Sequence, residues 1–289
     1  MVSENINHMD KISAQGKLFI CATPIGNLED VSIRLLKTLN YVDLIACEDT
    51  RHTIKLLNHY EIKKPLVSYH EHSSSNREAY LIDKLLAGEN IALVSDAGMP
   101  TISDPGENLI KSAILHDIGL EVIPGPSALT AALAISGLDT SSFTFLGFLP
   151  SKSKRRRELL RDLAQENRTI VIYESPYRLL DTLNEMSIIM GKDRPVAIAR
   201  ELTKIYEEVK RGSLEEVLAH YEENPVKGEI CILIGVSDRP QEVDFAQVIE
   251  EVRQLIDSGV SKKEAFKMKA REYSIKKSSI YNYFVKNDD

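Results

Sequence analysis

The sequence has few cysteines and none of the spacings that metal or disulfide frameworks use. Cys21, Cys47 and Cys231 lie far apart, each within an apolar run, and no C-x-x-C occurs. Zinc sites and disulfide scaffolds need clustered cysteines, so we expect three buried free thiols. His70 and His72 would share one face of an extended segment, but no third ligand accompanies them, and we expect no bound metal.

Long apolar runs are also missing. The longest, such as residues 230–234, stop far short of the ~18 residues that cross a bilayer. Residues 1–15 contain no apolar segment typical of a secretory signal. The sequence therefore predicts a cytoplasmic protein with no membrane partner and a disordered stretch over residues 1–15.

The composition is that of a globular protein with a mild acidic excess. Hydrophobic residues make up 43% and charged residues 27% of the 289 residues, a length that suggests two domains. The net charge is −7, from 36 basic and 43 acidic residues. This excludes a protein that coats nucleic acid over its whole surface. It leaves room for a local basic site, because charges beyond roughly 8–10 Å are screened at cellular salt.

Short apolar runs alternate with stretches of helical periodicity along most of the chain. We predict strands at 18–22, 44–47, 91–95, 120–123, 143–148, 169–173, 196–200 and 229–236, and helices at 31–39, 77–87, 108–115, 155–164 and 213–221. This alternation predicts α/β layers with largely parallel, buried strands. Turn formers and a basic run at 147–153 predict one α/β domain over 16–148 and a second over 149–236.

The end of the chain differs in composition. Residues 237–240 indicate a linker, and 241–289 contain helical segments at 246–257, after the cap Ser261, and at 274–285. Three short helices resemble a helix-turn-helix unit, which would contact nucleic acid or serve only as a packing appendage. Eight Lys or Arg against two acids between 262 and 286, interleaved with aromatics, favour RNA contact through residues such as Lys276 and Lys277.

Three loops rich in Gly and Pro follow predicted strands, at 23–30, 95–106 and 124–128. The carboxyl ends of parallel strands form the ligand crevice of an open α/β sheet. Neither phosphate-binding glycine motif is present, and the loops carry acids rather than Lys or Arg. This suits a cationic ligand rich in hydroxyls, such as S-adenosylmethionine. Asp104 would also cap a helix that begins at Pro105.

Seven motifs in order resemble one enzyme family. They are TPIGNL at 23–28, EDTR at 48–51, SDAGMP at 95–100, DPG at 104–106, PGPSA at 124–128, ESPYR at 174–178 and ARELTK at 199–204. Together they resemble the 2′-O-methyltransferases of small-subunit ribosomal RNA, within the tetrapyrrole methylase superfamily. The resemblance covers roughly residues 16–235, and the basic tail resembles that family's small C-terminal domain.

The resemblance implies two α/β domains of the tetrapyrrole methylase type with S-adenosylmethionine in the interdomain cleft. It implies a homodimer that methylates the ribose 2′-hydroxyl of a cytidine in the decoding region of 16S ribosomal RNA, within the assembled small subunit. By position, the cofactor contacts in the first domain would be Pro24, Asp96, Ala97, Gly98, Met99, Ser103, Asp104, Pro105, Ser127 and Ala128. Those in the second domain would be Tyr173, Arg200 and Gly228.

The catalytic residues are harder to assign. Glu48, Asp49, His70 or His72 would accept the hydroxyl proton, and Arg51 would hold a phosphate. The alternative for residues 48–51 is a helix start with an acid at its positive end. One local departure from the family, the serines after His72, weakens a role for that histidine.

A basic run at the domain junction, Lys154, Arg155, Arg156 and Arg157, adds a second candidate RNA contact, with a solvated helix start as the alternative. Cations at a helix N-terminus oppose its dipole, and that cost invites a functional explanation. Two other functions stay open: a methyltransferase of the same fold acting on a tetrapyrrole precursor, and a ligand-sensing regulator that binds nucleic acid without catalysis.

Overall fold

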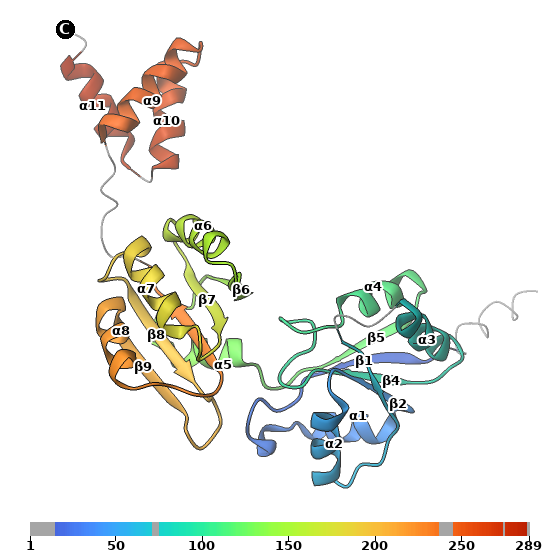
Figure 1. Ribbon diagram of the computed structural model, residues 1–289. Helices are drawn as coiled ribbons and strands as arrows, with labels where there is room; N and C mark the ends of the chain where they lie inside the picture. The colour runs from blue at the N-terminus through green and yellow to red at the C-terminus, as the bar shows by residue number, and fades with distance from the viewer. Residues whose placement is uncertain (1–14, 71–74, 237–244, 274, 288–289) are drawn as a thin grey trace, which may run out of the picture. The chain divides into compact units, whose positions relative to one another are not determined.

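The computed structural model describes residues 15–70, 75–236, 245–273 and 275–287, and the chain divides into two units, residues 1–236 and 237–289 (Figure 1). Disorder was expected over residues 1–15. Residues 1–14 lie outside the described residues, and residue 15 is described. The eight strands predicted from the sequence are all present, within two residues at either end. The three cysteines are buried and free, as predicted.

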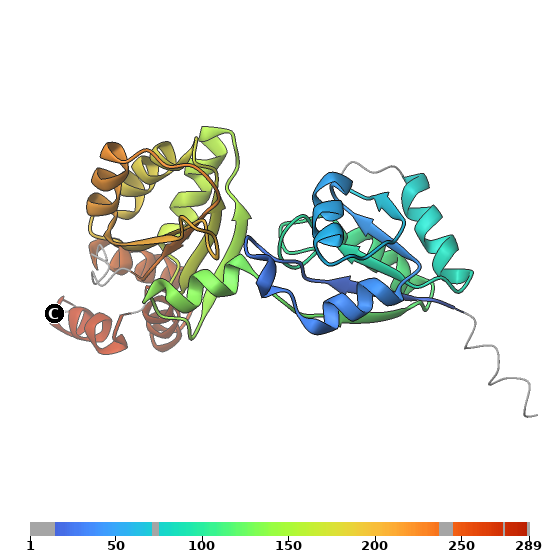
Figure 2. The ribbon, with the colours of Figure 1, turned by 90° about the horizontal axis from the view of Figure 1, so that it is seen from below.

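The first sheet contains five parallel strands in the order β3-β2-β4-β1-β5. They are β1 (Lys17–Cys21), β2 (Leu44–Cys47), β3 (Leu66–Ser68), β4 (Ile91–Val94) and β5 (Gly119–Ile123). Helices α1 (Ile33–Tyr41) and α2 (Thr50–His59) cover one face, and α3 (Ser75–Leu86) and α4 (Glu107–Leu115) cover the other (Figures 1 and 2). Alternate residues of β1 enter the two cores, Leu18 toward α3 and α4 and Phe19 toward α1 and α2.

The second sheet is mixed, in the order β6-β7-β10-β8-β9. Its strands are β6 (Phe143–Phe148), β7 (Thr169–Glu174), β8 (Pro195–Arg200), β9 (Glu208–Ser213) and β10 (Ile230–Ile234). Helices α6 (Ser153–Ala164), α7 (Leu179–Met190) and α8 (Leu214–Glu223) pack on one face, and α5 (Ala128–Ser136) packs on the other.

The expectation of largely parallel strands is wrong for this sheet, where only β6 and β7 pair in parallel. A short loop, rather than a helix, joins β8 to β9, and such a connection allows only antiparallel pairing. β10 then inserts between β7 and β8, antiparallel to both.

The boundary predicted at 148/149 also needs correction. β6, assigned from the sequence to the first domain, pairs with β7 in the second sheet, and α5 packs on that sheet as well. The chain therefore leaves the first sheet after Ile123, before the turn formers at 147–153 that suggested the boundary. Those turn formers end β6 and begin α6 instead.

Residues 237–289 form a separate unit whose described part contains α9 (Phe245–Asp257), α10 (Lys262–Glu272) and α11 (Lys277–Asn287). Their shared core includes Val248, Ile249, Phe266, Ile280 and Phe284. Ser261 caps α10 by accepting a hydrogen bond from the Glu264 amide, as the sequence predicts. Among the described helices of the whole chain, none is long and apolar enough to cross a membrane.

Candidate cofactor and catalytic site

A cavity of about 320 Å³ opens beside the carboxyl ends of the first sheet's strands and one edge of the second sheet. Nine of the residues predicted to hold the cofactor line it: Ala97, Gly98, Met99, Ser103, Asp104, Ser127, Ala128, Tyr173 and Gly228. The lining also includes Ile25, Ile102, Phe148, Glu174, Ser175, Pro176, Ala199, Leu202, Glu229, Ile230 and Cys231, which sequence reasoning did not single out for this role. Several of these residues belong to the family motifs, such as Ile25 in TPIGNL and Leu202 in ARELTK, so the motifs themselves mark the cavity.

The first loop is fixed to the loop after β4 by backbone pairing. The Thr23 amide donates to the Gly98 carbonyl at 2.9 Å, and the Gly98 amide donates back to the Thr23 carbonyl at 3.0 Å. Gly98 has φ of +80°, a conformation that favours glycine. Pro24 lies between Thr23 and Ile25, outside the cavity lining, and lines a neighbouring hollow instead.

The second half of the β4–α4 loop is strained. Thr101 and Ser103 have φ of +72° and +66°, values that are costly for residues with a Cβ. The predicted cap at Asp104 is wrong, because α4 begins at Glu107 with Gly106 as its N-cap. Pro105 is accordingly not the first helical residue, and it does not line the cavity. Asp104 is freed from capping and contributes to the cavity wall.

The Asp104 carboxyl experiences an unusual environment. Burial, followed by repulsion from Glu48 and Asp96, raises its pKa from the ordinary 3.8 to about 7. A cation in the cavity would relieve that repulsion and restore the charged form. None of the described lining residues is Lys or Arg, so the cavity itself supplies no counter-charge.

The second sheet closes the cavity with an aromatic wall and a tight turn. Tyr173 stacks edge-on against Phe145 and Phe148, with ring centroids 5.0 and 5.7 Å away, and burial raises its pKa to about 12. Gly228 has φ of +94°, and a Cβ there would lie 2.3 Å from the Glu201 carboxyl carbon. Arg200 is not part of the lining. It pairs with Glu208 at 2.9 Å and donates to the Lys227 carbonyl beside Gly228.

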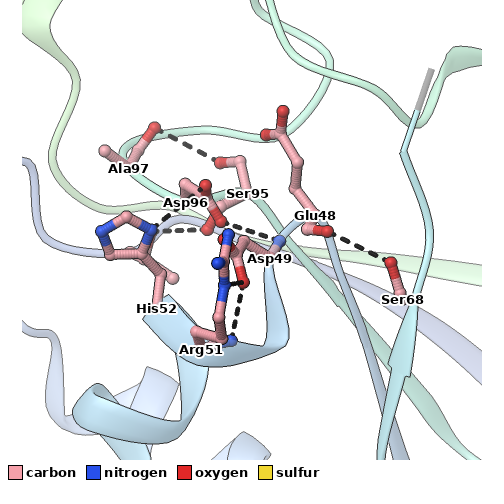
Figure 3. A network of polar contacts seen from close by, with 9 residues as sticks. Glu48, Asp49, Arg51, His52, Ser68, Ser95, Asp96 and Ala97 are labelled. Carbon is pink, nitrogen blue, oxygen red and sulfur yellow. Dashed lines mark hydrogen bonds and ion pairs between the residues drawn. The ribbon is translucent and has the colours of Figure 1, made fainter.

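The turn after β2 holds the predicted catalytic residues (Figure 3). Asp49 is the N-cap of α2 and accepts a hydrogen bond from the Arg51 amide at 2.8 Å, so the helix-start alternative is confirmed. The Arg51 guanidinium also donates to both Asp49 oxygens, at 3.0 Å to Oδ1 and 2.6 Å to Oδ2, and lowers the pKa of that carboxyl to about 2. The Arg51 side chain is 88% exposed, which leaves most of the guanidinium open to a partner from solution.

Asp96 links this turn to the β4–α4 loop. Its carboxylate accepts from the Asp49 amide at 3.0 Å and pairs with His52 Nδ1 at 3.5 Å (Figure 3). It lines the neighbouring hollow with His52, and not the cavity. Asp49, His52 and Asp96 are the group among the described residues whose ligand atoms lie close enough for a metal ion, within 4.8 Å. The helix cap and the ion pairs with Arg51 and His52 account for this grouping without a metal.

Glu48 stands apart from these pairs. Its carboxylate points away from the Arg51–Asp49 pair in Figure 3, and burial together with the Asp96 charge raises its pKa. Its backbone carbonyl accepts from Ser68 Oγ at 3.3 Å. His70, the other described candidate base, lies near enough to lower the pKa of Glu48, whereas His72 falls outside the described residues.

The two basic regions divide into exposed and buried side chains. Lys154, Arg155 and Arg157 are exposed on α6, and Lys276 and Lys277 are exposed at the start of α11. Arg156 is only 6% exposed, and its Nε binds Glu185 Oε2 at 2.7 Å. The predicted RNA contact by Arg156 is therefore wrong, because the residue lies one turn before Leu160 on the buried face of α6.

A parallel sheet joined to a mixed sheet, with a cavity at the strand ends, defines a two-sheet α/β protein with a ligand-binding site at its strand ends. Residues 17–218 match the model of the Tetrapyrrole (Corrin/Porphyrin) Methylases, and the chain belongs to this family. This confirms the family and the fold class expected from the sequence motifs.

Relatives agree over nearly the whole chain. The protein named ribosomal RNA small subunit methyltransferase I from Halalkalibacterium halodurans is 48% identical, over 93% of this chain and 95% of its own length. The protein of the same name from Bacillus subtilis is 44% identical, over 95% of this chain and 96% of its own length. Two solved structures share the fold. A cobalt precorrin-4 methyltransferase gives a TM-score of 0.59 at 19% identity, covering 76% of this chain and 94% of its own. A diphthine synthase gives a TM-score of 0.61 at 14% identity, and the match covers 75% of this chain and 89% of the synthase.

The raised pKa of Asp104 predicts a pH-dependent cost to stability. Below pH 4 the Asp104 carboxyl is neutral in both the folded and the unfolded state and costs nothing. Since the folded state raises its pKa from 3.8 to about 7, stability is lost as the pH rises from about 4 through 7, and the cost is complete above that range. Asp104→Asn should therefore stabilise the ligand-free protein by about 1–2 kcal/mol at pH 8, because one pKa unit corresponds to ~1.4 kcal/mol and solvent relieves part of the shift. Urea unfolding at pH 4 and pH 8 measures this. Exposed Asp83 on α3 gives the control Asp83→Asn, and equal effects of the two variants at pH 8 would contradict the assignment.

The burial of Arg156 predicts a structural role. Arg156→Ala should lower the free energy of unfolding by about 2 kcal/mol, because the largely buried Glu185 carboxylate then keeps only the Ser153 hydroxyl and the more distant Arg157. Arg155→Ala, on the exposed face of the same helix, should change it by less than ~0.5 kcal/mol. Chemical unfolding of both variants tests the contrast, and an Arg156→Ala protein of unchanged stability would refute the structural role.

Proposed function

We propose that this chain transfers a methyl group from S-adenosylmethionine to the ribose 2′-hydroxyl of a cytidine in the decoding region of 16S ribosomal RNA. The observation that carries the proposal is 44–48% identity, over more than 90% of the chain, to proteins named ribosomal RNA small subunit methyltransferase I. A structure of the same fold, uroporphyrin-III C-methyltransferase from Thermus thermophilus, was solved with S-adenosyl homocysteine, and supports the cofactor.

The cavity fits this cofactor chemically. A ligand with a sulfonium and an ammonium needs negative charge, and the described lining offers Asp104 and contains no Lys or Arg. Its other two carboxylates, Glu174 and Glu229, already pair with Arg178 and Lys204. Apolar side chains such as Met99 and Ile102 give an adenine ring a surface to pack against. When bound, the cofactor supplies an electrophilic methyl group, so the protein needs to orient the acceptor and remove one proton.

Glu48 is the proposed base. Its pKa is raised by burial and by the charge of Asp96, which brings a carboxylate closer to the pH at which a general base works well. Asp49 is a poor base, because Arg51 lowers its pKa to about 2. Arg51 is proposed to contact an RNA phosphate with the exposed part of its guanidinium, while Asp49 fixes its orientation.

The exposed cations that would bind RNA phosphates are Lys154, Arg155 and Arg157 of α6 and Lys276 and Lys277 of the C-terminal unit. We further propose that the substrate is the assembled small subunit in the cytoplasm and that the protein works as a homodimer. The tail favours this substrate over a tetrapyrrole precursor, because a small molecule does not require a separate basic unit. A ligand-sensing regulator would have no need of a raised-pKa carboxylate at the cofactor cavity.

Substitutions at the β2–α2 turn should separate chemistry from cofactor binding. Glu48→Gln should lower the single-turnover methylation rate by 10²–10⁴-fold, the usual contribution of a positioned base, with little change in cofactor affinity. Arg51→Ala should weaken binding of the small subunit with little change in cofactor affinity. Labelled cofactor with small subunits, naked RNA or tetrapyrrole precursors as acceptors gives the rates, and calorimetry gives the affinity. Equal losses of rate and cofactor affinity would mean that these residues support the fold alone.

Removal of residues 237–289 should weaken RNA binding and spare the cofactor, since every proposed cofactor residue lies before the second unit. Each lost phosphate contact on single-stranded RNA should reduce the slope of log affinity against log salt by about 0.7. The double variant Lys276→Gln/Lys277→Gln should also make the salt dependence of RNA affinity shallower, but by less than the truncation does. A truncated protein with unchanged affinity and salt slope would show that the tail is not an RNA contact.

A further inference from the structure

The strand ends on one side of the second sheet, called here its edge, carry both the cavity wall and unusually exposed apolar side chains. β7 and β8 point the same way, because each is antiparallel to β10, which lies between them. The ends of β7 and β8 and the starts of β9 and β10 therefore meet at one edge. Cavity residues Pro176, Leu202 and Gly228 come from the loops of this edge.

The same loops display the two most exposed large apolar side chains of the described chain. Tyr177, beside Pro176, is 96% exposed, and Ile205, in the β8–β9 loop, is 95% exposed. Next to Ile205, Tyr206 is 71% exposed. Exposing such side chains at the mouth of a binding cavity is characteristic of a contact surface.

The loop that carries Tyr177 is firmly held. Glu174 is buried and accepts hydrogen bonds from the Ser175 amide at 2.8 Å and from Thr182 Oγ1 at 2.7 Å. Arg178 donates to the Leu149 carbonyl at 3.0 Å, which ties the loop to the segment after β6. The exposed ring therefore projects from a fixed support.

The loop that carries Tyr206 is held in a similar way. Lys204 Nζ bridges Glu201 and Glu229 at 2.7 and 3.0 Å, and the Thr203 amide donates to the Glu207 carboxylate at 2.6 Å. The backbones that carry both rings are thus preorganised, which lowers the entropy cost of binding a partner.

We propose that Tyr177 and Tyr206 stack on nucleobases that flank the target nucleotide of the RNA, on either side of the cavity mouth. The inference rests on the proposed function. Three strand spacings of about 4.8 Å separate β7 from β9, roughly 14 Å in all. That exceeds the ~3.4 Å step between neighbouring bases in a helix, so we place the two loops, which extend from the ends of these strands, on either side of an extruded nucleotide.

An RNA partner is favoured by the surroundings of the rings. Aromatic side chains stack on any base, and the exposed cations Lys154 and Arg155 on α6, after β6 of the same sheet, supply phosphate contacts. The alternative occupant of this edge is a second copy of the chain, and the experiment below distinguishes the two.

The chain contains no tryptophan, so Tyr177→Trp introduces a single fluorescent reporter. Its emission should be quenched on addition of a short single-stranded RNA that carries the target cytidine. Tyr177→Ala and Tyr206→Ala should each raise KM for small subunits roughly 10-fold while cofactor affinity stays unchanged, and Tyr177→Phe and Tyr206→Phe should restore KM. Tyr41→Ala, at an exposed tyrosine of α1, is the matched control and should leave KM unchanged.

Two results would overturn the stacking proposal. One is an unchanged KM in both alanine variants that still bind cofactor. The other is conversion of a dimeric protein to a monomer by the same substitutions, seen by sedimentation, which would assign the edge to a second copy. If the wild-type protein methylates no RNA acceptor, the proposed function itself fails, and this outcome is distinct from either.

Discussion

The two backbone hydrogen bonds between Thr23 and Gly98 are the constraint on which the site depends. They join the loop after β1 to the loop after β4, and so fix the wall that carries Ala97 and Met99. They also set the position of Ile25, which packs with Val171, Ala199 and Leu233 of the second sheet. A single short bridge therefore couples the first sheet, the cavity and the second sheet, and any side chain at position 98 would act on all three.

Like charges concentrated around this bridge give the site its electrostatic character. The charges of Glu48 and Asp96 raise the pKa of Asp104, and the charge of Asp96 raises the pKa of Glu48, an effect that His70 partly offsets. Asp96 itself accepts from the Asp49 amide and pairs with His52. Asp104 lines a cavity whose described lining contains no Lys or Arg, and Glu48, outside that lining, lies close enough to raise the pKa of Asp104. A cationic ligand would relieve the repulsion between these carboxyls, so it would bind more tightly. Without the ligand, the same repulsion lowers the stability of the folded protein.

The sequence predicted the elements that periodicity and apolar content define, and failed where tertiary contacts decide. The eight strands it located are mostly apolar, whereas β3 has three residues and β9, EVKRGS, is largely polar. Motif position brought nine cofactor candidates to one cavity. It misplaced Asp96, whose carboxylate accepts from the Asp49 amide at the end of a neighbouring strand. It also assigned Asp104 a helix cap that it does not form, because α4 begins only at Glu107. Arg156 was read as a free cation because its partner Glu185 lies on another helix.

The polar edge strand β9 has a consequence for solubility. An edge strand presents unpaired backbone groups that readily recruit a strand from another molecule. Here β9 carries Glu208, Lys210 and Arg211 along its length, and Arg211 reaches across to the carbonyl of Ser136 at the end of α5. Neighbouring copies that add a strand would have to desolvate these charges and displace that contact. The weakness of the strand signal in this segment and its resistance to edge-to-edge aggregation thus have one cause.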